Sequence, residues 1–560
     1  MREGRKEIKN LLFSSFVLYE IFLCTKLQCC YLNHRGVYPE YSRRIALFRV
    51  ISIIQHCVAC ITNATLIHIN LPLTHYSNIF FMQLPEALLD SLKNVEGFNK
   101  EAFKQVHDAG EQLTSIRINP AKWSMDVSLN HRLSNDSPQQ SVSSIHYSPF
   151  TIDENVSWSQ FGYYLSRRPS FTFDPLFHAG CYYVQEASSM FLEQALKQLV
   201  DLSKPTKVLD LSAAPGGKST HIQSLVSSES LLVSNEVIRS RCNVLTDNII
   251  KWGSNNVMVT NNDPSAFKKL PGYFDVIVVD APCSGSGLFR KDETAIEEWS
   301  LNNVTLCSQR QQRILADVLP ALKENGLLIY STCSYSKEED EEIGDWLVEE
   351  FEMQNEKLKV ETEWNIVESA SSKTGAMGYR FYPYNIKGEG FFISCFRKTT
   401  TGKEARIKTA KIEKATTKEK AVIQPWLKDI EVELIKEADS FTALPAYFLN
   451  DYTYLKSALN IPYKGTGIGQ IMKDKLVPHH SFALSTIISD KVITTELFYE
   501  EAVKYLQRRD INIKPSALGW QTVNYQKHNL GWINALSNRI NNYYPKELRI
   551  LKQDNPAFKK

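Results

Sequence analysis

Short apolar runs alternate with longer amphipathic segments from about residue 208 onward. Each run has the length of a buried strand, and each intervening segment is long enough for a crossover helix. Strands connected in this way form a parallel sheet with helices on both faces. The pattern therefore predicts an α/β domain with a doubly wound, Rossmann-like sheet. The expected strands are Val208–Leu211, Leu231–Ser234, Val257–Val259, Val276–Val279 and Leu327–Tyr330, with Phe391–Phe396 as a late strand.

Residues on either side of this pattern predict further domains. Residues 82–200 combine helical spacing near the start with a strand-like run, Thr114–Pro120, so we expect an N-terminal α+β domain there. The α/β domain is expected over residues 201–398. Arg397–Lys420 then carries nine Lys and Arg against three Glu, which predicts a basic linker at 399–424, with a basic arm lying along phosphates as the alternative. Globular sequence resumes over 425–560.

The first 81 residues do not match the rest of the chain. Leu11–Cys24 is apolar but short and contains Glu20, and Ile45–Leu73 is interrupted by charged and histidine side chains, so neither is a good membrane span. Our hypothesis is that residues 1–81 are an atypical extension of translated non-coding sequence and that Met82 is the true start. An accessory extension and a membrane anchor are the alternatives.

Composition restricts the class of protein. The 560 residues have a formal net charge of +2, so a nucleic-acid surface must be a local patch and not a property of the whole chain. The 11 cysteines are dilute and irregular, which favours a reducing, cytoplasmic location over a secreted disulfide scaffold. Cys57 and Cys60 form a lone pair without a second pair at zinc spacing, so no metal is expected.

A turn of small residues follows the first strand of the α/β domain and precedes a helix. Small residues let a ligand approach the backbone, and the helix start offers free N–H groups. Glu236 follows the second strand, where an acid can bind ribose hydroxyls, and Asp263 follows the third, where it could meet an adenine amine. Together they predict a nucleoside cofactor. The residues of the turn are Ser212, Ala213, Ala214, Pro215, Gly216, Gly217 and Lys218.

Two cysteines follow two later strands of the sheet. Asp280-Ala-Pro-Cys283 ends one strand and Ser331-Thr-Cys333-Ser334 ends the next. Because functional groups collect at the carboxyl ends of such strands, we expect both thiols and Asp280 to meet beside the cofactor loop. Ser336–Glu339 has capping-box spacing, and we interpret it as the start of a helix.

Thiols at this place indicate pyrimidine chemistry. C5 of cytosine is a poor nucleophile, but thiolate addition at C6 makes C5 enamine-like and able to accept a methyl group. Asp280 would hydrogen-bond N3 and the exocyclic amine, while Lys218 would help to ionise the thiol. Spacing does not say which cysteine attacks. Methyltransferases of exocyclic amines carry a different tetrad here, so Asp280–Cys283 argues against that class.

With these motifs, the chain resembles the RNA 5-methylcytosine methyltransferases of the Nol1/Nop2/Sun family, in particular its bacterial branch that acts on 16S ribosomal RNA. The resemblance covers about Met82–Leu551. It is carried by the three motifs above together with Ser115–Pro120, Tyr183–Ser189 and Gly388–Phe392. The resemblance implies a class I S-adenosylmethionine-dependent fold. It also implies a C-terminal PUA-like RNA-binding domain containing Lys464–Gly469, Val477–Ser481 and Gly531-Trp532.

The resemblance also implies roles for individual residues. Cys333 would be the nucleophile, Cys283 would assist product release, and S-adenosylmethionine would be bound by Ser212–Lys218, Glu236, Asp263 and Asp280. We therefore expect an RNA partner, no membrane and a monomer. Transfer RNA as substrate, and a non-catalytic RNA clamp in ribosome assembly, are the alternatives.

Overall fold

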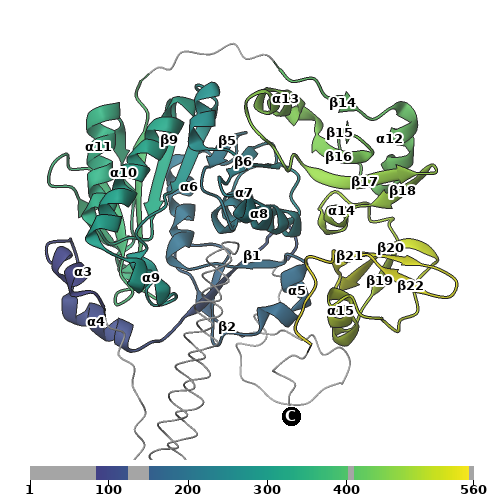
Figure 1. The fold of residues 1–560 in the computed structure, drawn as a ribbon, viewed down its shortest axis with the longest axis horizontal. Helices are drawn as coiled ribbons and strands as arrows, with labels where there is room; N and C mark the ends of the chain where they lie inside the picture. The colour runs from purple at the N-terminus through teal and green to yellow at the C-terminus, as the bar shows by residue number, and fades with distance from the viewer. Residues whose placement is uncertain (1–83, 124–150, 401–408, 554–560) are drawn as a thin grey trace, which may run out of the picture. The chain divides into compact units, whose positions relative to one another are not determined.

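The structure is a computed structural model, which describes residues 84–123, 151–400 and 409–553 (Figure 1). All of these residues belong to one structural unit, Phe81–Lys560. The expectations for residues 1–81 and for Met82 lie outside the described residues. In the part of the chain that the structure describes, no helix is both long and apolar enough to cross a membrane.

A mixed sheet forms the centre of the α/β domain. Its strands are β5 (Lys207–Asp210), β6 (Leu231–Asn235), β7 (Val257–Thr260), β8 (Phe274–Asp280), β9 (Leu322–Thr332), β10 (Gln354–Glu356), β11 (Val367–Ala370), β12 (Met377–Phe381) and β13 (Phe391–Arg397). The order is β11-β12-β13-β9-β8-β5-β6-β7, with β10 also paired to β13. Strands β5 to β9 run parallel and β13 is antiparallel to β9. The six predicted strands are confirmed.

Helices cover both faces of this sheet. They are α6 (Leu192–Leu199), α7 (Gly217–Leu225), α8 (Arg239–Trp252), α10 (Leu301–Val318) and α11 (Glu341–Phe351). Val208 packs in a hydrophobic cluster with residues of α6, α7 and α8, whereas its neighbour Leu209 packs in a second cluster with residues of α10 and α11. Successive residues of a strand point to opposite faces, so a strand buried on both sides is apolar throughout.

The strand order reverses at β5. The chain runs from β5 to β6 and β7 on one side, then returns to β8 and β9 on the other. Open α/β sheets bind ligands in the crevice at such a reversal, beyond the carboxyl ends of the strands. Strand β5 ends at Asp210 and β8 ends at Asp280. The topology therefore brings the cofactor loop and both cysteine loops to one edge of the sheet.

The N-terminal region forms a separate four-stranded sheet in the order β2-β3-β1-β4. Its strands are β1 (Thr114–Ile118), β2 (Ile152–Asn155), β3 (Gly162–Leu165) and β4 (Tyr182–Val184). Helix α5 (Pro175–His178) packs in the same hydrophobic cluster as this sheet. Helices α3 (Glu86–Ser91), α4 (Lys100–Asp108) and α9 (Thr294–Glu298) pack in a different cluster. Strand β1 confirms the predicted run at Thr114–Pro120, and α3 confirms the helix expected at the start of this region.

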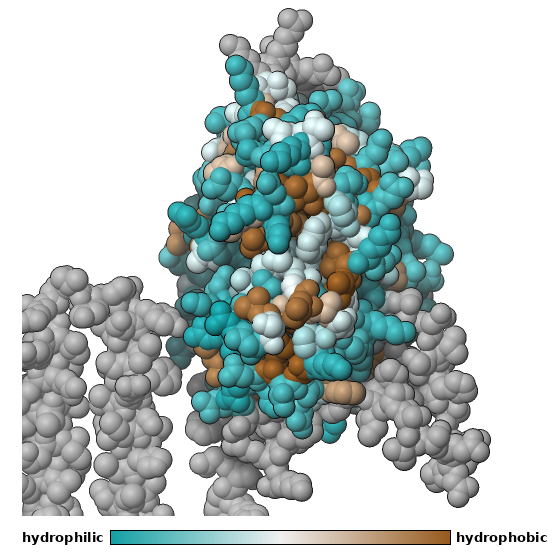
Figure 2. All heavy atoms as spheres, turned by 90° about the vertical axis from the view of Figure 1, so that its right-hand side faces the viewer, coloured by the Kyte–Doolittle hydropathy of each residue, from teal (hydrophilic) through white to brown (hydrophobic). Residues whose placement is uncertain are grey.

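The C-terminal region holds two further sheets. The first contains β14 (Glu413–Lys414), β15 (Val432–Glu437), β16 (Ser440–Pro445), β17 (Thr466–Met472) and β18 (Lys475–Pro478). The second contains β19 (Thr494–Glu496), β20 (Gly519–Tyr525), β21 (His528–Ala535) and β22 (Ile540–Asn542). Helices in this region are α12 (Thr417–Ile423), α13 (Leu449–Ala458), α14 (His480–Leu484) and α15 (Tyr499–Leu506). Figure 2 shows apolar patches within the mostly hydrophilic surface on this side of the molecule.

The basic linker expected at 399–424 is wrong for its second half. A capping box between Thr416 and Glu419 starts α12, and Ile423 at its end is fully buried. Lys414 and Lys420 both pair with Glu433 of β15 at 2.9 Å, so their charges are partly neutralised by the sheet. The lysine-rich composition did not predict this short helix, because the carboxylate that pairs with the lysines of this segment, Glu433, belongs to a later strand.

The glycines of Lys464–Gly469 serve strand packing. A Cβ at Gly469 would lie 2.1 Å from the carbonyl oxygen of Val477, and one at Gly467 would lie 3.0 Å from the Ser481 hydroxyl. These residues therefore let β17 lie close to β18 and to the start of α14. The sequence predicts that they form part of a PUA-like RNA surface, whereas their close packing in the structure gives a different reason for glycine at these positions.

Candidate functional site

Two cysteine thiols meet at the carboxyl edge of the central sheet. Cys283 follows β8 and Cys333 follows β9, and the register pairs Asp280 with Ser331. The two Sγ atoms are 2.9 Å apart. Both thiols are free, and both residues are partly exposed. The sequence prediction that these residues converge is confirmed by this geometry.

The backbone after Cys283 folds over the Cys333 loop. The amide of Gly287 donates to the carbonyl oxygen of Cys333 at 2.8 Å. A Cβ at Gly287 would lie 2.6 Å from the carbonyl oxygen of Gly390 and 2.8 Å from that of Cys333. Only a residue without a side chain fits between these two segments. The glycine-rich run therefore fixes the position of one cysteine loop relative to the other.

A buried carboxylate joins the residues that follow the two cysteines. Glu339 accepts hydrogen bonds from the Ser284 hydroxyl at 2.5 Å and from the Ser334 hydroxyl at 2.6 Å. Its other oxygen accepts from the Ser284 amide at 2.8 Å and from the Gln311 side chain at 3.2 Å. Burial raises the pKa of Glu339, and these hydrogen bonds oppose the rise. The capping-box interpretation of Ser336–Glu339 is therefore wrong, since Ser336 makes no side-chain cap.

Glu339→Gln tests this bridge. An amide has one acceptor oxygen, so it cannot accept from both hydroxyls and from the Ser284 amide at once. We expect the free energy of unfolding to fall by about 2 kcal/mol, the typical cost of disturbing a buried charged hydrogen bond. Methyl-transfer turnover should fall roughly tenfold because the two thiols lose their fixed separation. Thermal unfolding measures the first effect and single-turnover rates measure the second. An unchanged rate in a destabilised variant would show that Glu339 contributes to stability and not to turnover.

A lysine and an aspartate face the cysteines. Lys218 Nζ lies 2.8 Å from Asp280 Oδ2, and the Ser331 hydroxyl donates to Asp280 Oδ1 at 2.8 Å. Burial alone would lower the pKa of Lys218, but the negative charges of Asp280 and of a Cys333 thiolate raise it above its usual value. Lys218 is therefore a permanent cation next to Cys333. Such a cation stabilises a thiolate.

Cys283 holds its proton more firmly than an ordinary thiol. The hydrogen bond with Cys333 and burial both raise its pKa well above the usual value. In a pair of thiols that share a proton, one sulfur is the anion and the other is the donor. This environment favours Cys283 as the protonated partner.

The loop after β5 has the features of a ligand cradle. Gly216 has φ of 112°, a conformation that side chains disfavour, and α7 begins at the next residue. Asp210 is fully buried, accepts from the Ser219 hydroxyl at 2.6 Å, and has one carboxylate oxygen without a hydrogen-bond partner among the described residues. Burial, together with the charges of Asp280 and Glu236, raises the pKa of Asp210 to about 7, although the Ser219 hydrogen bond and the Lys218 charge oppose the rise. This concentration of carboxylates fits a cationic ligand.

The two acids expected to bind a nucleoside have different environments. Glu236 is buried, accepts from the Ile238 amide at 2.9 Å, and lies 3.6 Å from Arg241. Arg241 also donates to the carbonyl oxygen of Ala214 at 2.8 Å, so it links Glu236 to the loop. Asp263 accepts from Ser265, and its side chain remains 46% exposed. A role for Asp263 toward adenine stays a prediction.

An amide that the sequence reasoning missed ties these strand ends together. The Asn235 side chain donates to the carbonyl oxygens of Leu211 and Asn262 at 3.1 and 3.0 Å. It also accepts from the Thr260 hydroxyl at 2.9 Å. The loops after β5 and β7 are thus held to the end of β6. Its only signal in the sequence is its place directly before Glu236.

Three family models of one methyltransferase family match parts of this chain. The family model described as 16S rRNA methyltransferase RsmB/F matches residues 197–397, and models of the RsmF N-terminal domain and of the RsmF PUA domain match 84–187 and 492–550. A ribosomal RNA small subunit methyltransferase F from Aeromonas salmonicida is 31% identical over 426 residues, covering 72% of this chain and 86% of the relative. The chain belongs to the RsmB/F methyltransferase family.

A second relative extends the match along the chain. A ribosomal RNA small subunit methyltransferase F from Vibrio vulnificus is 29% identical over 491 residues, covering 84% of this chain and 98% of the relative. A solved methyltransferase homologue from Pyrococcus horikoshii is 28% identical and covers 56% of this chain and all of its own, with a TM-score of 0.43. The resemblance stated from the sequence is confirmed. The PUA match includes Gly531-Trp532 but not Lys464–Gly469 or Val477–Ser481, which lie before it.

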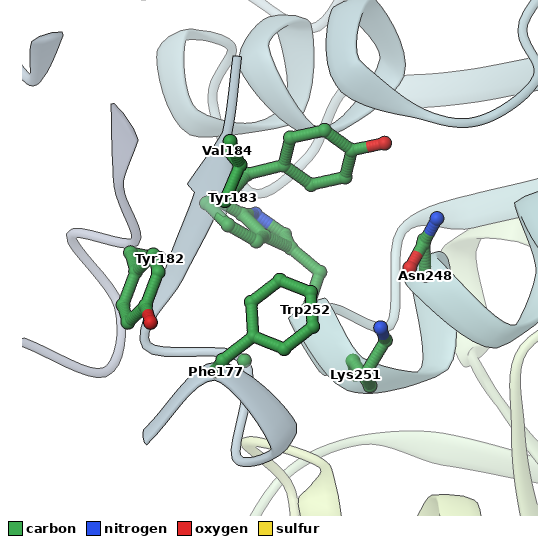
Figure 3. Close-up of a pocket in the computed structure, with 8 residues that line it drawn as sticks. Phe177, Tyr182, Tyr183, Val184, Asn248, Lys251 and Trp252 are labelled. Carbon is green, nitrogen blue, oxygen red and sulfur yellow. The ribbon is translucent and has the colours of Figure 1, made fainter. Parts of the chain in front are cut away.

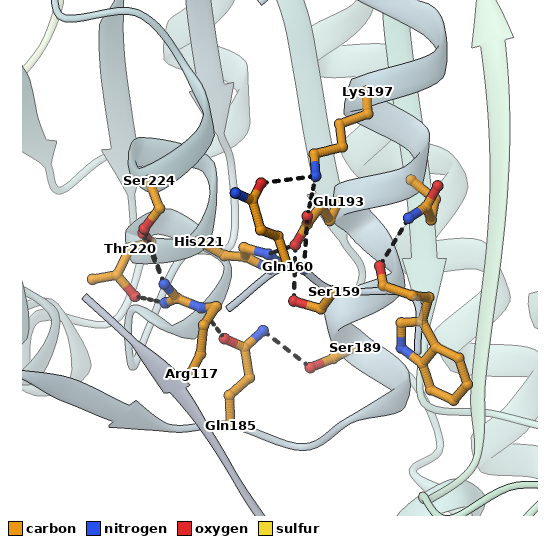
Figure 4. Close-up of polar contacts among 12 residues, drawn as sticks. Arg117, Ser159, Gln160, Gln185, Ser189, Glu193, Lys197, Thr220, His221 and Ser224 are labelled. Carbon is orange, nitrogen blue, oxygen red and sulfur yellow. Dashed lines mark hydrogen bonds and ion pairs between the residues drawn. The ribbon is translucent and has the colours of Figure 1, made fainter. Parts of the chain in front are cut away.

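The N-terminal domain of this RsmB/F chain holds the cofactor-loop helix through one arginine (Figure 4). Arg117 of β1 is fully buried and donates to the Gln185 side chain at 2.8 Å and the Thr220 hydroxyl at 2.5 Å. It also donates to the carbonyl oxygen of Gly217 at 3.3 Å and the Ser224 hydroxyl at 3.1 Å. Burial lowers the pKa of Arg117 to about 9, so the group remains charged at neutral pH. Its donors fix the first turns of α7.

A second buried pair in Figure 4 supports the same helix. His221 Nε2 lies 3.1 Å from Glu193 of α6, and Glu193 also accepts from the Ser159 hydroxyl at 2.8 Å. Lys197 lies 2.6 Å from the other oxygen of Glu193. Burial lowers the pKa of His221 to about 4, so the imidazole is neutral and donates to the carboxylate. Helix α7 is therefore held on two sides by charged groups of the N-terminal region and α6.

Arg117→Lys tests the link between β1 and the cofactor loop. Lysine keeps the charge but cannot reach four acceptors with one ammonium group. We expect the KM for S-adenosylmethionine to rise about tenfold, the equivalent of one charged hydrogen bond, while kcat changes little. Steady-state kinetics measure KM and kcat separately, and calorimetry measures the binding of the cofactor. A matched fall in kcat with an unchanged KM would show that Arg117 does not act through the loop.

Proposed function

We propose that this chain methylates C5 of a cytosine in 16S ribosomal RNA through a covalent bond between Cys333 Sγ and C6 of the base. The observation that carries the proposal is the pair of thiols at the ends of β8 and β9, next to the Lys218–Asp280 ion pair. Membership of the RsmB/F family supports the reaction class and the substrate.

Addition of the thiol activates the base. The Cys333 thiolate adds to C6, breaking the C5–C6 π bond and making C5 nucleophilic. Asp280 would accept a hydrogen bond from the exocyclic amine, and Lys218, 2.8 Å from Asp280, would donate a proton to N3 as negative charge develops there. The target base must leave its stack to enter the crevice.

Release of the product reverses the addition. Once C5 carries the methyl group, loss of its proton to a base restores the C5–C6 double bond and expels the Cys333 thiolate. Cys283, 2.9 Å from the leaving sulfur, provides a proton donor for that thiolate. Its raised pKa supports this role over a nucleophilic one. The family resemblance assigns the same roles to the two cysteines.

The cofactor would be S-adenosylmethionine, which supplies the methyl group when bound. The residues that would hold it are the loop Ser212–Lys218, with Glu236, Asp263 and Asp280. The positive φ of Gly216 and the unpartnered oxygen of Asp210 support a ligand at this place. A sulfonium cation suits a crevice with several carboxylates.

The partners follow from the substrate. The chain would act as a monomer on RNA in the cytoplasm, with the N-terminal region and the PUA match at 492–550 adding RNA contacts beyond the target base. The domain bounds that we propose are 82–200, 201–398 and 425–560, with residues 399–424 connecting the last two.

Bisulfite sequencing tests the substrate and separates three functions. Cells lacking the gene should lose the 5-methylcytosine mark at one position of small-subunit ribosomal RNA, and the wild-type gene should restore it. Loss of a transfer-RNA mark instead would make transfer RNA the substrate. No lost mark in either RNA would favour a non-catalytic clamp. The Cys333→Ala gene serves as the matched control, because it should not restore the mark.

A further inference from the structure

A second pocket lies between the N-terminal domain and α8, apart from the cysteine loops (Figure 3). It encloses about 130 Å³ and opens to solvent. Its lining is mostly aromatic, with one amide and one ammonium group. The residues that line it are Phe177, Gly180, Tyr182, Tyr183, Val184, Asn248, Lys251 and Trp252.

The rings form the walls of this pocket. In Figure 3, Tyr183 and Phe177 lie on opposite sides of the opening and Trp252 lies between them. The Phe177 and Tyr183 side chains are only half-buried. Planar ligands gain most from such an arrangement, because rings can stack on them from two sides. The shape therefore favours a flat, aromatic occupant.

Polar groups are gathered on one side of the opening. Lys251 and Asn248 project from α8 on the side facing the rings. The Lys251 ammonium lies 4.8 Å from the Phe177 ring. Burial lowers the pKa of Lys251 to about 8, and the charge of Asp247 opposes this fall. An anionic group on the occupant would further stabilise the charged form of Lys251. A stacked base with its adjoining phosphate has both properties.

The two walls of the pocket are in close contact, and one of them is joined to the cofactor loop. A Cβ at Gly180 would lie 1.9 Å from the carbonyl oxygen of Lys251, so the two backbones are in direct contact. Asn248 donates to the carbonyl oxygen of Pro215 at 2.7 Å, and the Arg117 guanidinium lies 4.6 Å from the Trp252 ring. An occupant would therefore lie near the catalytic domain's own ligand loop while remaining outside it.

We propose that this pocket binds one unpaired nucleobase of the RNA substrate, other than the methylated base, with Lys251 contacting the adjoining phosphate. The proposal rests on RNA being the substrate, as argued above. The pocket would anchor the RNA at a second point and so fix which cytosine reaches Cys333. A peptide segment is the competing occupant, since it could also use the rings.

Two substitutions in the full-length enzyme test the site. Phe177→Leu keeps apolar volume but removes the stacking face, and Lys251→Gln removes the charge. With in vitro transcribed 16S ribosomal RNA as the probe, we expect Phe177→Leu to raise the RNA Kd about tenfold. Lys251→Gln should raise the RNA Kd severalfold. It should also reduce the salt dependence of RNA binding by the amount expected for about one phosphate contact. The control Lys357→Gln removes an exposed lysine beyond β10 and should change neither value.

Further measurements separate the possible outcomes. The Kd for S-adenosylmethionine should stay within about twofold in both variants, since stacking on RNA is the interaction removed. A weakened cofactor with unchanged RNA affinity would make the pocket a support for the loop and overturn the proposal. RNA affinities equal to that of Lys357→Gln would overturn it as well, and would leave a peptide as the remaining occupant.

Crosslinking of the wild-type enzyme avoids any folding defect. Ribosomal RNA containing 4-thiouridine, irradiated in the complex, should label the peptide that contains Tyr182–Val184 or Phe177. Label confined to the cysteine loops would contradict the second site. A wild-type enzyme that does not methylate 16S ribosomal RNA would instead contradict the proposed function, so the two failures are distinguishable.

Discussion

Cys333→Ala should abolish methyl transfer to RNA. Alanine has no nucleophile, so C5 of the target base is never activated, and removal of an enzyme nucleophile lowers turnover on the order of 10⁴-fold or more. Transfer of a radiolabelled methyl group to ribosomal RNA measures the loss. Binding of RNA and of S-adenosylmethionine should remain, because neither the Lys218–Asp280 pair nor the cofactor loop is altered.

The matched control for this variant is Cys395→Ala. Cys395 is a fully buried thiol on β13 and lies in the sheet's hydrophobic cluster. Its replacement removes a thiol and a little packing, so activity should persist with a small loss of stability. A Cys333→Ala enzyme that still transfers methyl groups, beside an active Cys395→Ala enzyme, would remove the covalent route from the mechanism.

The sequence predicted the meeting of the two cysteines because strand ends obey simple topology. A buried apolar run before Asp280 and another before Ser331 required neighbouring parallel strands, and parallel strands end at the same edge. The register confirms this, since Asp280 pairs with Ser331. Local pattern and global fold agree here, so residues as far apart as Cys283 and Cys333 could be placed together without a structure.

The residues that support the site could not be found in this way. Glu339 has the spacing of a helix cap, yet its carboxylate turns inward to serine hydroxyls beside both cysteines. Arg117 lies in a strand of another domain, and its acceptors on α7 are 100 or more residues away in the sequence. Such contacts depend on how the domains pack against each other, and the hydrophobic pattern of the sequence does not predict that packing.

The same limit explains the basic segment before α12. The high density of lysines in this segment predicted a solvated linker, because lysines without acidic partners nearby in the sequence are expected to remain in water. The partner, Glu433, belongs to a later strand and pairs with Lys414 and Lys420. The pocket beside α8 is a similar case, because its rings come from α5, β4 and α8 and are assembled only by the fold.

Cys283→Ala should trap the enzyme on its RNA. Cys333 can still add to C6, since Lys218 and Asp280 remain in place to stabilise the thiolate and the base. The departing thiolate, however, loses the proton donor that lies 2.9 Å away. Loss of a general acid typically lowers the rate of the step that it assists by about 10²- to 10⁴-fold. The methylated covalent adduct should therefore accumulate.

Denaturing gel electrophoresis with labelled ribosomal RNA detects this adduct as a band of reduced mobility. The wild-type enzyme should give little of it, and Cys283→Ala with Cys333→Ala combined should give none, because the bond needs the sulfur at position 333. If Cys283→Ala yields no adduct and Cys333→Ala does, the two roles are exchanged. That exchange would leave the raised pKa of Cys283 without a mechanistic consequence and would make the Lys218 charge act on the other sulfur.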